Sequence, residues 1–365
     1  MLHRREMLLS ILGGSLAAAF AGPPAQAFPA YPQISLPAIP IRNLTGFDAV
    51  AGASAASRLL VGGEHGVIVY SDDAAKTWHQ ADVPASVTIT NIAFVTPEVG
   101  WATGSLGVVL RTQDGGKTWV KQLDGLEEID LMNTATQVYV ASQPAGSDQA
   151  VRATRRAQIL TQSGPDKPML AVLPISTSKV LIFGSYRFAD YSTDGGKSWT
   201  DWSLHIGDPM SHNIYDAAAI GGAYYVVGEE GLIFRSTDGG QSFPQLAQVG
   251  MATLFGITDV GGGAILVYGV SGSAYLSADA GKTWNPCKFA GTDNINAVVR
   301  LASGPLVAGD SGGGLWVSKD NGQSFSLVMR NPLMSVNALQ PIDGPRFLLL
   351  SMAGIIPLDL SSFPA

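Results

Sequence analysis

The chain has 365 residues, a formal net charge of −7, 43 glycines and a single cysteine, and only 14% of its residues are charged. The acidic balance argues against nucleic acid or an anionic membrane surface as the main partner. One cysteine, Cys287, excludes an internal disulfide, so stability must come from a buried core, for which this length is ample. The glycine content fits many tight turns between buried strands.

The first residues have the pattern of an export signal. Arg4 and Arg5 precede an apolar run from Met7 to Phe20, and Ala25-Gln26-Ala27 offers a cleavage site of small residues. The pattern is similar to a twin-arginine signal, and an ordinary secretory signal is the alternative. The run is too short, and too interrupted by glycine, to be a membrane-spanning helix. We therefore predict a signal peptide at 1–27 and a periplasmic protein.

An eight-residue pattern, Ser/Thr-x-Asp-x-Gly-x-Ser/Thr-Trp/Phe, recurs along the chain. Each copy follows a short apolar run, which places it in the turn that leaves a strand. The aspartate can accept backbone N–H groups of its own turn, the glycine adopts positive φ, and the aromatic ring enters the core. This is the Asp-box, or BNR, signature. Its expected structural residues are Asp73, Asp114, Asp194, Asp238, Asp279 and Asp320, with Trp78, Trp119, Trp199 and Trp284.

The spacing of the boxes predicts the fold. The box aspartates recur every 41 to 44 residues, apart from an interval of 80 between Asp114 and Asp194. A unit of this size that holds four short strands is typical of a propeller blade. The last unit, 336–360, has three strands and no box, and we expect a fourth from Ile34 to Arg42, which would close the ring. The sequence thus predicts an all-β, seven-bladed β-propeller at 45–360, preceded by a linker and ring-closing strand at 28–44.

The interval of 80 residues could hide an eighth, degenerate blade or hold an insertion. Apolar residues from Leu126 to Val140 fall near helical spacing. Residues 149–161 lack strand alternation and are followed by Gly164-Pro165, as helices often are. We therefore prefer a helical hairpin at 126–162 on a seven-bladed ring. Glu127-Glu128 could pair with Arg155-Arg156 between the two helices, with a small contribution if exposed.

The topology of a blade separates two faces of the ring. Box turns lie on one face, whereas the turns between second and third strands and the connections between blades lie on the other. The hairpin and the long connection from His205 to His212 belong to this second face, and loops on a rigid scaffold are the usual place for function. For each residue alone, an ordinary solvated loop is the simpler interpretation. The candidate partner-binding residues there are Arg152, Arg155, Arg156, Tyr186, Arg187, His212, Tyr215, Glu229 and Glu230.

The glycine-rich box units of this chain resemble those of the photosystem II stability/assembly factor family of BNR propellers. Residues 164–170, 212–215 and 228–240 are similar to its non-photosynthetic bacterial branch. The resemblance covers residues 45–360. It implies a seven-bladed, non-catalytic assembly or chaperone-like factor that acts on a protein partner in a membrane-associated complex. Photosynthetic members present an arginine-rich patch to their partner, whereas this chain has few basic residues.

An enzyme is the alternative, because Asp-boxes also occur in sialidases. Those glycosidases resemble one another by an Arg-Ile-Pro motif and by three arginines that bind a carboxylate, whereas residues 39–43 here read Ile-Pro-Ile-Arg-Asn. An arginine cluster could be assembled from Arg42, Arg187, Arg235 and Arg300, although Arg235 occupies a repeated position just before a box.

A carbohydrate-binding module is a third possibility, with Tyr186 and Trp202 as exposed aromatic residues. The histidines show no pairing at metal-ligand spacing. The sequence therefore predicts no catalytic residue, no cofactor and no metal.

Overall fold

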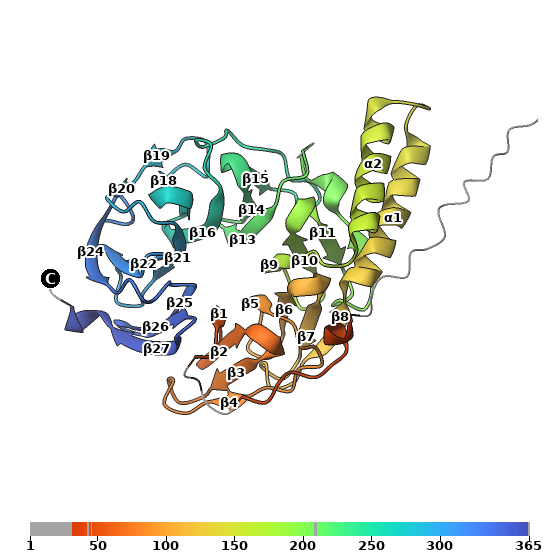
Figure 1. The fold of residues 1–365 in the computed structure, drawn as a ribbon. Helices are drawn as coiled ribbons and strands as arrows, with labels where there is room; N and C mark the ends of the chain where they lie inside the picture. Colours follow the sequence, from red (N-terminus) through yellow and green to blue (C-terminus); the bar gives the residue numbers. More distant parts are fainter. Residues whose placement is uncertain (1–30, 42–43, 45, 208–209, 364–365) are drawn as a thin grey trace, which may run out of the picture. The chain divides into compact units, whose positions relative to one another are not determined.

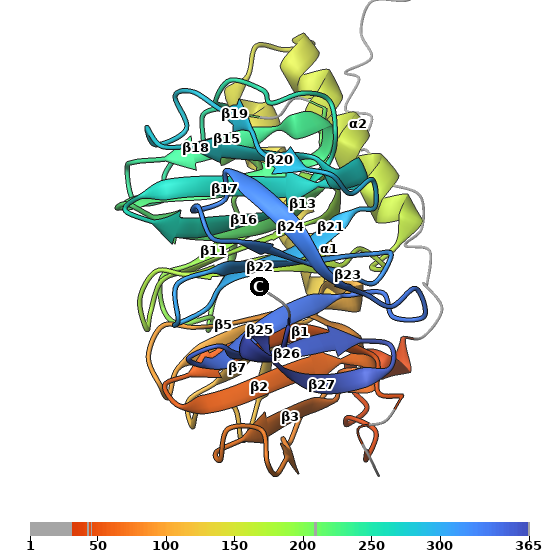
Figure 2. The ribbon, with the colours of Figure 1, turned by 90° about the vertical axis from the view of Figure 1, so that its left-hand side faces the viewer.

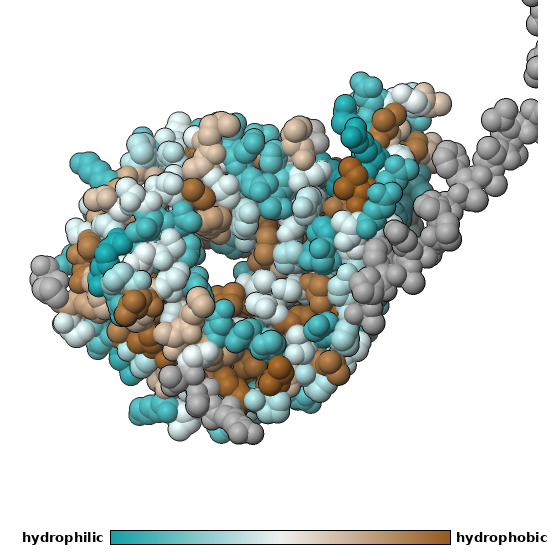
Figure 3. Space-filling model, viewed as in Figure 1, coloured by the Kyte–Doolittle hydropathy of each residue, from teal (hydrophilic) through white to brown (hydrophobic). Residues whose placement is uncertain are grey.

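The computed structural model describes residues 31–41, 44, 46–207 and 210–363, so the predicted signal peptide and Arg42 lie outside the described residues. The described chain forms seven sheets arranged radially around a central opening (Figure 1). The opening remains visible when all atoms are drawn (Figure 3). Each sheet is an antiparallel meander of consecutive strands, with one extra parallel strand in the sixth sheet, and the sheets follow one another around the ring in sequence order. The predicted seven-bladed propeller is confirmed.

The first four blades contain the following strands. Blade 1 contains β1 (Ala49–Ala55), β2 (Arg58–Gly63), β3 (Ile68–Ser71) and β4 (His79–Gln80). Blade 2 contains β5 (Ile89–Phe94), β6 (Gly100–Gly104), β7 (Val109–Thr112) and β8 (Val120–Leu123). Blade 3 contains β9 (Met169–Pro174), β10 (Val180–Gly184), β11 (Ala189–Ser192) and β12 (Thr200–Asp201). Blade 4 contains β13 (Ile214–Ile220), β14 (Ala223–Gly228) and β15 (Ile233–Ser236).

The remaining blades complete the ring. Blade 5 contains β16 (Leu254–Gly261), β17 (Ala264–Gly269), β18 (Ala274–Ser277) and β19 (Asn285–Pro286). Blade 6 contains β21 (Ile295–Arg300), β22 (Leu306–Asp310), β23 (Gly314–Ser318) and β24 (Ser324–Arg330), with β20 (Lys288–Phe289) parallel to β24. Blade 7 contains β25 (Ala338–Asp343), β26 (Arg346–Ser351) and β27 (Gly354–Asp359).

The core is divided into clusters that each join two neighbouring blades. Between blades 7 and 1, for example, Leu348 and Leu350 of β26 pack with Leu59 and Val61 of β2. Polar side chains add a second link at this junction, since Asn337 Nδ2 donates to the carbonyl of Ala49 over 3.1 Å. Every blade thus buries both of its faces against its neighbours, which is the physical reason why a closed ring of sheets is stable.

The ring closes without the expected strand exchange. The described part of the segment 34–42 forms no strand, and blade 7 has three strands. Instead, Ala38 N donates to the carbonyl of Val83 over 2.9 Å, and Ile41 N donates to Gln80 Oε1 over 2.9 Å, so the segment lies along blade 1. Our expectation of a fourth strand does not hold for residues 34–41, because their polar backbone groups find partners on the first blade.

Among the described strands, β27 has a neighbour on one side only, so it forms the outer edge of blade 7, and Pro357 lies in the middle of it. Asn337 N donates to the carbonyl of Leu350, so the backbone polar groups of Leu350 point towards β25. Those of Leu348, two residues before it, point the same way. Pro357 lies opposite Leu348 in the pairing of β26 with β27. Because the backbone groups of Leu348 point away from β27, the nitrogen of Pro357 points away from β26, to the outer edge. Proline has no N–H to offer, and proline on an edge discourages the pairing of another strand.

The interval between blades 2 and 3 holds a helical hairpin, as predicted. It consists of α1 (Gly125–Ser142) and α2 (Asp148–Ser163) and stands against the rim beside blade 3 (Figures 1 and 2). Asp124 caps α1 by accepting from Leu126 N and Glu127 N, while Glu127 accepts from Asp124 N, which is a capping box. Met132 and Leu160 join the core between blades 2 and 3. None of the helices in the described chain combines the length and apolarity needed to cross a membrane.

Candidate partner-binding face

The turn between the second and third strands has the same backbone in five blades, in which it is a single 3-10 turn. These turns are η2 (Glu64–Gly66), η3 (Ser105–Gly107), η4 (Ser185–Arg187), η6 (Glu229–Gly231) and η7 (Val270–Gly272). The middle residue of each has a positive φ of 54–58°. The last residue is glycine in all of these turns except that of blade 3, where Arg187 has a φ of 59°.

Glycine is required at this position in the other blades by close packing. A Cβ atom on Gly66, Gly231 or Gly272 would collide with the backbone carbonyl of a residue in the connection to the next blade. Blade 3 has a longer connection, and Arg187 N donates to the carbonyl of His212 over 2.9 Å. Left-handed backbone is unfavourable for arginine, and such strain gathers at functional sites. Blade 3 thus departs from the repeat at a point where the repeat is strict.

The Arg187 side chain turns into the protein and is only 9% exposed. It belongs to a group of five charged residues, one from each of α1, α2, η4, β11 and β12, which we call the hairpin cluster. Its members are Glu128, Arg156, Arg187, Asp190 and Asp201. The cluster joins the inserted hairpin to blade 3.

Arginine contacts connect the hairpin cluster to the surface above it. Arg156 Nη2 donates to the carbonyl of Tyr186 over 2.9 Å, and the Arg156 guanidinium lies 5.3 Å from the centre of the Phe188 ring. Burial and the neighbouring charge of Arg187 lower the pKa of Arg156 to about 10. Asp201 Oδ1 accepts from the Ser203 hydroxyl over 2.7 Å and from its backbone N–H over 3.1 Å.

The carboxyl groups of the cluster are unusual acids. Burial raises the pKa of Glu128 well above its usual range, and the neighbouring Asp190 carboxylate raises it further. Burial also raises the pKa values of Asp190 and Asp201. Shifts of this kind arise because a low-dielectric environment disfavours the charged form of an acid. They mark this region as a candidate functional site.

Sequence analysis named Glu128, Arg156 and Arg187 but missed the two aspartates of this cluster, Asp190 and Asp201. The expected pair of helices does bring Glu128 and Arg156 together, but Glu128 is buried and Arg156 is half-buried, whereas Arg155 is exposed. Asp190 carried a signal that the repeat makes visible. It lies two residues before the box serine, where the other blades place an apolar or aromatic residue, such as Val69, Leu110 or Phe234.

Above the cluster lies a mixed polar and aromatic surface, which we call the blade 3–4 face. Tyr186 is 48% exposed, and its backbone N–H donates to Asn213 Oδ1 over 2.7 Å. Asn213 in turn donates to both carboxylate oxygens of Glu229, over 2.9 and 3.1 Å. Lys167 Nζ lies 5.7 Å from the centre of the Tyr186 ring, and His212 Nε2 lies 3.4 Å from Glu230 Oε2.

The predicted partner-binding residues are distributed over two depths. Tyr186, His212, Glu229 and Glu230 lie on the blade 3–4 face, while Arg156 and Arg187 are beneath it. Tyr215 is half-buried, with its ring 5.3 Å from that of Phe255. Arg152 and Arg155 are exposed on α2. Their role in binding stays a prediction.

The box aspartates have a repeated set of hydrogen bonds within their own turns. Asp194 Oδ1 accepts from Ser192 Oγ, Lys197 N and Ser198 N over 2.9–3.0 Å, and Oδ2 accepts from Ser198 Oγ over 2.6 Å. These donors favour the carboxylate and hold its pKa well below the usual range. Trp119 and Trp199 are buried, whereas Trp78 and Trp284 are half-buried.

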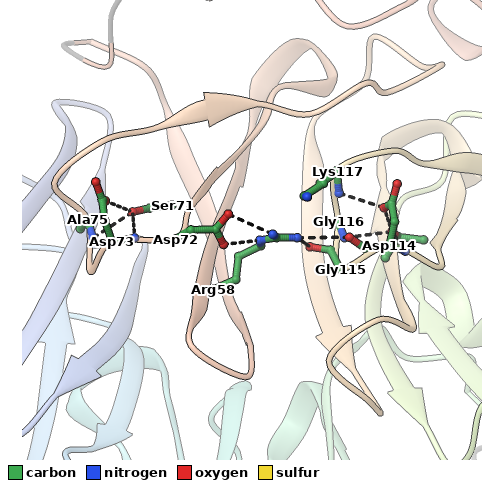
Figure 4. Close-up of polar contacts among 10 residues, drawn as sticks. Arg58, Ser71, Asp72, Asp73, Ala75, Asp114, Gly115, Gly116 and Lys117 are labelled. Atoms are coloured by element: carbon green, nitrogen blue, oxygen red, sulfur yellow. Dashed lines mark hydrogen bonds and ion pairs between the residues drawn. The ribbon is translucent and has the colours of Figure 1, made fainter.

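The boxes are also linked to one another. Arg58 Nε donates to Asp72 Oδ1 over 2.7 Å, and its Nη1 donates to the carbonyls of Gly115 and Asp114 in the next box over 2.9 and 3.1 Å (Figure 4). Arg58 thus ties the box of blade 1 to the box of blade 2. No group of His, Cys, Asp and Glu side chains in the described chain has the geometry of a metal site.

Comparison with known proteins decides the family. A family model described as "Photosynthesis system II assembly factor YCF48" matches residues 69–144 and 166–335, more than half of the chain. The chain belongs to this family. The unmatched residues 145–165 contain α2, so the second helix of the hairpin lies outside what the Ycf48 model describes.

Individual Ycf48 relatives are distant. The photosystem II assembly protein Ycf48 of Synechococcus sp. (strain JA-2-3B'a(2-13)) is 24% identical over 170 residues, which are 46% of this chain and 39% of that protein. The chain therefore matches well under half of that relative's length. A solved structure described as "YCF48 bound to D1 peptide" has a TM-score of 0.61 at 13% identity, over 89% of this chain and 99% of that one. At this identity the likeness shows the fold alone.

An enzyme shares the architecture of this Ycf48-family chain. The GH74 xyloglucanase of Xanthomonas campestris has a TM-score of 0.62 at 15% identity, over 88% of this chain and 54% of that one. This likeness also shows the fold alone, because one propeller fold carries many functions.

Several residues named for the enzyme and carbohydrate-binding alternatives make contacts of their own, whereas Tyr186 is exposed. Arg300 donates to the carbonyl of Gly304 and to Asn321 in a box turn, whereas Arg187 lies at the opposite end of its blade. Trp202 is half-buried, stacks on His205 with ring centres 3.7 Å apart, and donates to the carbonyl of Gly240. Burial raises the pKa of Cys287 to about 12, which makes it a poor nucleophile.

Proposed function

We propose that this Ycf48-family protein is an exported, non-catalytic factor that binds an extended segment of a protein partner during assembly of a membrane-associated complex. The binding surface is the blade 3–4 face. The single observation that carries this assignment is the turn 185–187, in which strained, buried Arg187 replaces the repeated glycine directly beneath exposed Tyr186. Family membership supports a role in assembly, and one related solved structure is of YCF48 bound to a D1 peptide.

The chemistry of the blade 3–4 face suits a peptide. Tyr186 offers a half-exposed aromatic ring on a backbone that is held by hydrogen bonds at both its N–H and its carbonyl group. Rigid aromatic side chains supply contact area at a low cost in conformational entropy. Lys167 lies on one side of the ring, and Glu229 and Glu230 follow on the neighbouring blade. A segment with an apolar residue between polar ones, and with a basic group directed to blade 4, complements this surface.

Site-specific crosslinking tests the assignment. A photo-reactive amino acid at position 186 should crosslink the full-length protein to a subunit of a membrane complex, whereas one at exposed Lys197 on the box face should not. The Glu229→Gln and Glu230→Gln variants should weaken the crosslink. Equal labelling from positions 186 and 197 would contradict the proposal, as would release of reducing sugar from xyloglucan by the purified protein.

Export is tested separately. The Arg4→Lys, Arg5→Lys double variant should stay in the cytoplasm if the twin-arginine route is used, because that route depends on the paired arginines. Immunoblots of periplasmic and cytoplasmic fractions measure the effect. A variant with a substitution at the predicted cleavage site, Ala27→Leu, should block processing by either route, so a processed product from it would contradict the signal-peptide assignment.

A further inference from the structure

We infer that a single proton shared between Glu128 and Asp190 holds the inserted hairpin on blade 3, so that the hairpin loosens as the pH rises. The inference goes beyond the proposed function, since it concerns how the hairpin docks and needs no partner for its test.

The geometry of the two carboxyl groups requires a proton between them. Glu128 is 2% exposed and Asp190 is fully buried, and the two groups lie within hydrogen-bonding reach of each other. Among the described residues, no N–H or O–H group donates to any of their four oxygen atoms. Two carboxylates in this position would repel each other, whereas one proton gives a short O–H···O⁻ hydrogen bond.

The charged groups around this pair come from other elements. Among the described residues, Arg156 from α2 and Asp201 from β12 act on both carboxyl groups, and Arg187 from η4 faces Arg156 and Asp201. The Arg156 guanidinium favours one negative charge on the pair, whereas Asp201 disfavours a second. Two unpaired negative charges in a buried site would be costly, so the pair that keeps one proton is the stable one. Asp124, at the start of α1, is paired separately with Lys121 over 2.5 Å.

The direction of the pH effect follows from the shifts in the folded state. Burial raises the pKa of Asp190 to about 7, and the pKa of Glu128 is also raised. An acid with a raised pKa contributes stability that is complete at pH values below its unfolded pKa. That contribution declines as the pH rises and is lost above the folded pKa. The docked hairpin should therefore be most stable in mild acid and weaken through neutral pH into alkali.

Loosening should be local. The helices contribute Met132 and Leu160 to the core between blades 2 and 3, but the strands around them have their own hydrogen bonds. Release of the hairpin would free Arg156 from the carbonyl of Tyr186. Asp216, whose pKa burial raises to about 6, accepts from Ile257 N of the next blade and would add a pH effect at blades 4 and 5, away from the hairpin.

Hydrogen exchange of the full chain tests the inference. Protection factors of amides in 125–163, corrected for intrinsic exchange rates, should fall about tenfold or more between pH 5.5 and pH 8.5, since one linked proton changes an equilibrium up to tenfold per pH unit. Strands of blade 6 should change less. Glu128→Gln keeps a hydrogen-bond donor at the site and should make protection of the hairpin independent of pH, and Asp190→Asn should do the same if the first variant misfolds.

The matched control is Asp130→Asn, an exposed acid on the same helix, which should retain the wild-type pH dependence. Hairpin protection that does not change with pH in the wild type would overturn the inference. A wild-type slope in both Glu128→Gln and Asp190→Asn would overturn it as well. If position 186 crosslinked no partner while the protection of the hairpin still depended on pH, only the proposed function would be contradicted.

Discussion

Blades 3 and 5 share one backbone plan but differ in how they use it. In blade 5, the turn ends at Gly272, the third strand carries Tyr275 two residues before the box serine, and a Cβ on Gly272 would collide with the carbonyl of Gly291. In blade 3, the matching positions hold Arg187 and Asp190, both buried. Since buried charges need partners, the hairpin stabilises blade 3 by bringing Glu128 and Arg156 to them. Blade 5 has no such charges to compensate, whereas blade 3 has them and packs against the insertion.

Removal of the hairpin should have the largest effect. Replacement of residues 126–162 by a short Gly/Ser linker would uncover Trp101 and Phe188 and leave the charges of blade 3 without α1 and α2. We expect a loss of several kcal/mol, on the order of a broken buried ion pair together with a core truncation. Denaturant unfolding measures it.

A revertant sharpens this result. Adding Arg187→Gly and Asp190→Val to the deletion restores the repeat consensus in blade 3 and should recover part of the lost stability. No recovery would mean that the cluster does not explain the dependence on the hairpin. If the deletion variant bound the partner with wild-type affinity, the hairpin would not be part of the binding surface.

Box substitutions should affect both blades alike. Asp194→Ala and Asp279→Ala each remove a carboxylate that accepts from the turn backbone and from a hydroxyl. Each should lower Tm by a few degrees, as expected for the loss of modest hydrogen bonds in a chain of this size. Calorimetry measures the change. A variant with wild-type Tm and lost partner binding would refute the structural role of the boxes.

The two regions should respond to pH in opposite directions. The Thr283 hydroxyl and other donors lower the pKa of Asp279 to about 2, so this group contributes stability above its unfolded pKa that is lost as the pH falls towards 2. The hairpin cluster instead loses stability as the pH rises. Tm measured from pH 2 to pH 9 should therefore fall at both ends. Asp279→Asn should reduce the fall of Tm at acid pH, and Asp190→Asn should reduce the fall of Tm from neutral to alkaline pH.

The smallest effect on stability should come from the exposed turn residues. Tyr186→Ala in blade 3 and Ser271→Ala in blade 5 change equivalent, exposed positions, so each should alter the free energy of unfolding by about 0.5 kcal/mol or less. If the proposed function holds, only Tyr186→Ala should weaken partner binding. Calorimetric titration with the subunit identified by crosslinking measures the affinity. Equal binding by both variants would move the site away from blade 3.

The sequence by itself determined the repeat architecture. Box turns are local, because Ser192, Asp194 and Gly196 bond within eight residues, and their spacing therefore predicts blades without knowledge of the ring. The hairpin was predictable for the same reason, from helical spacing between two blades.

Only the tertiary structure decided how the ring closes and where the charges meet. Segment 34–41 lies along blade 1, where Val83 and Gln80 accept hydrogen bonds from its backbone, and these contacts are between residues about 40 positions apart in the sequence. The hairpin cluster joins residues from 128 to 201, and its proton-binding character depends on burial and on distances between elements. Contacts between residues so far apart in the chain produce no regular spacing in the sequence. Asp190 is the exception, because it occupies a position where the other blades have an apolar or aromatic residue.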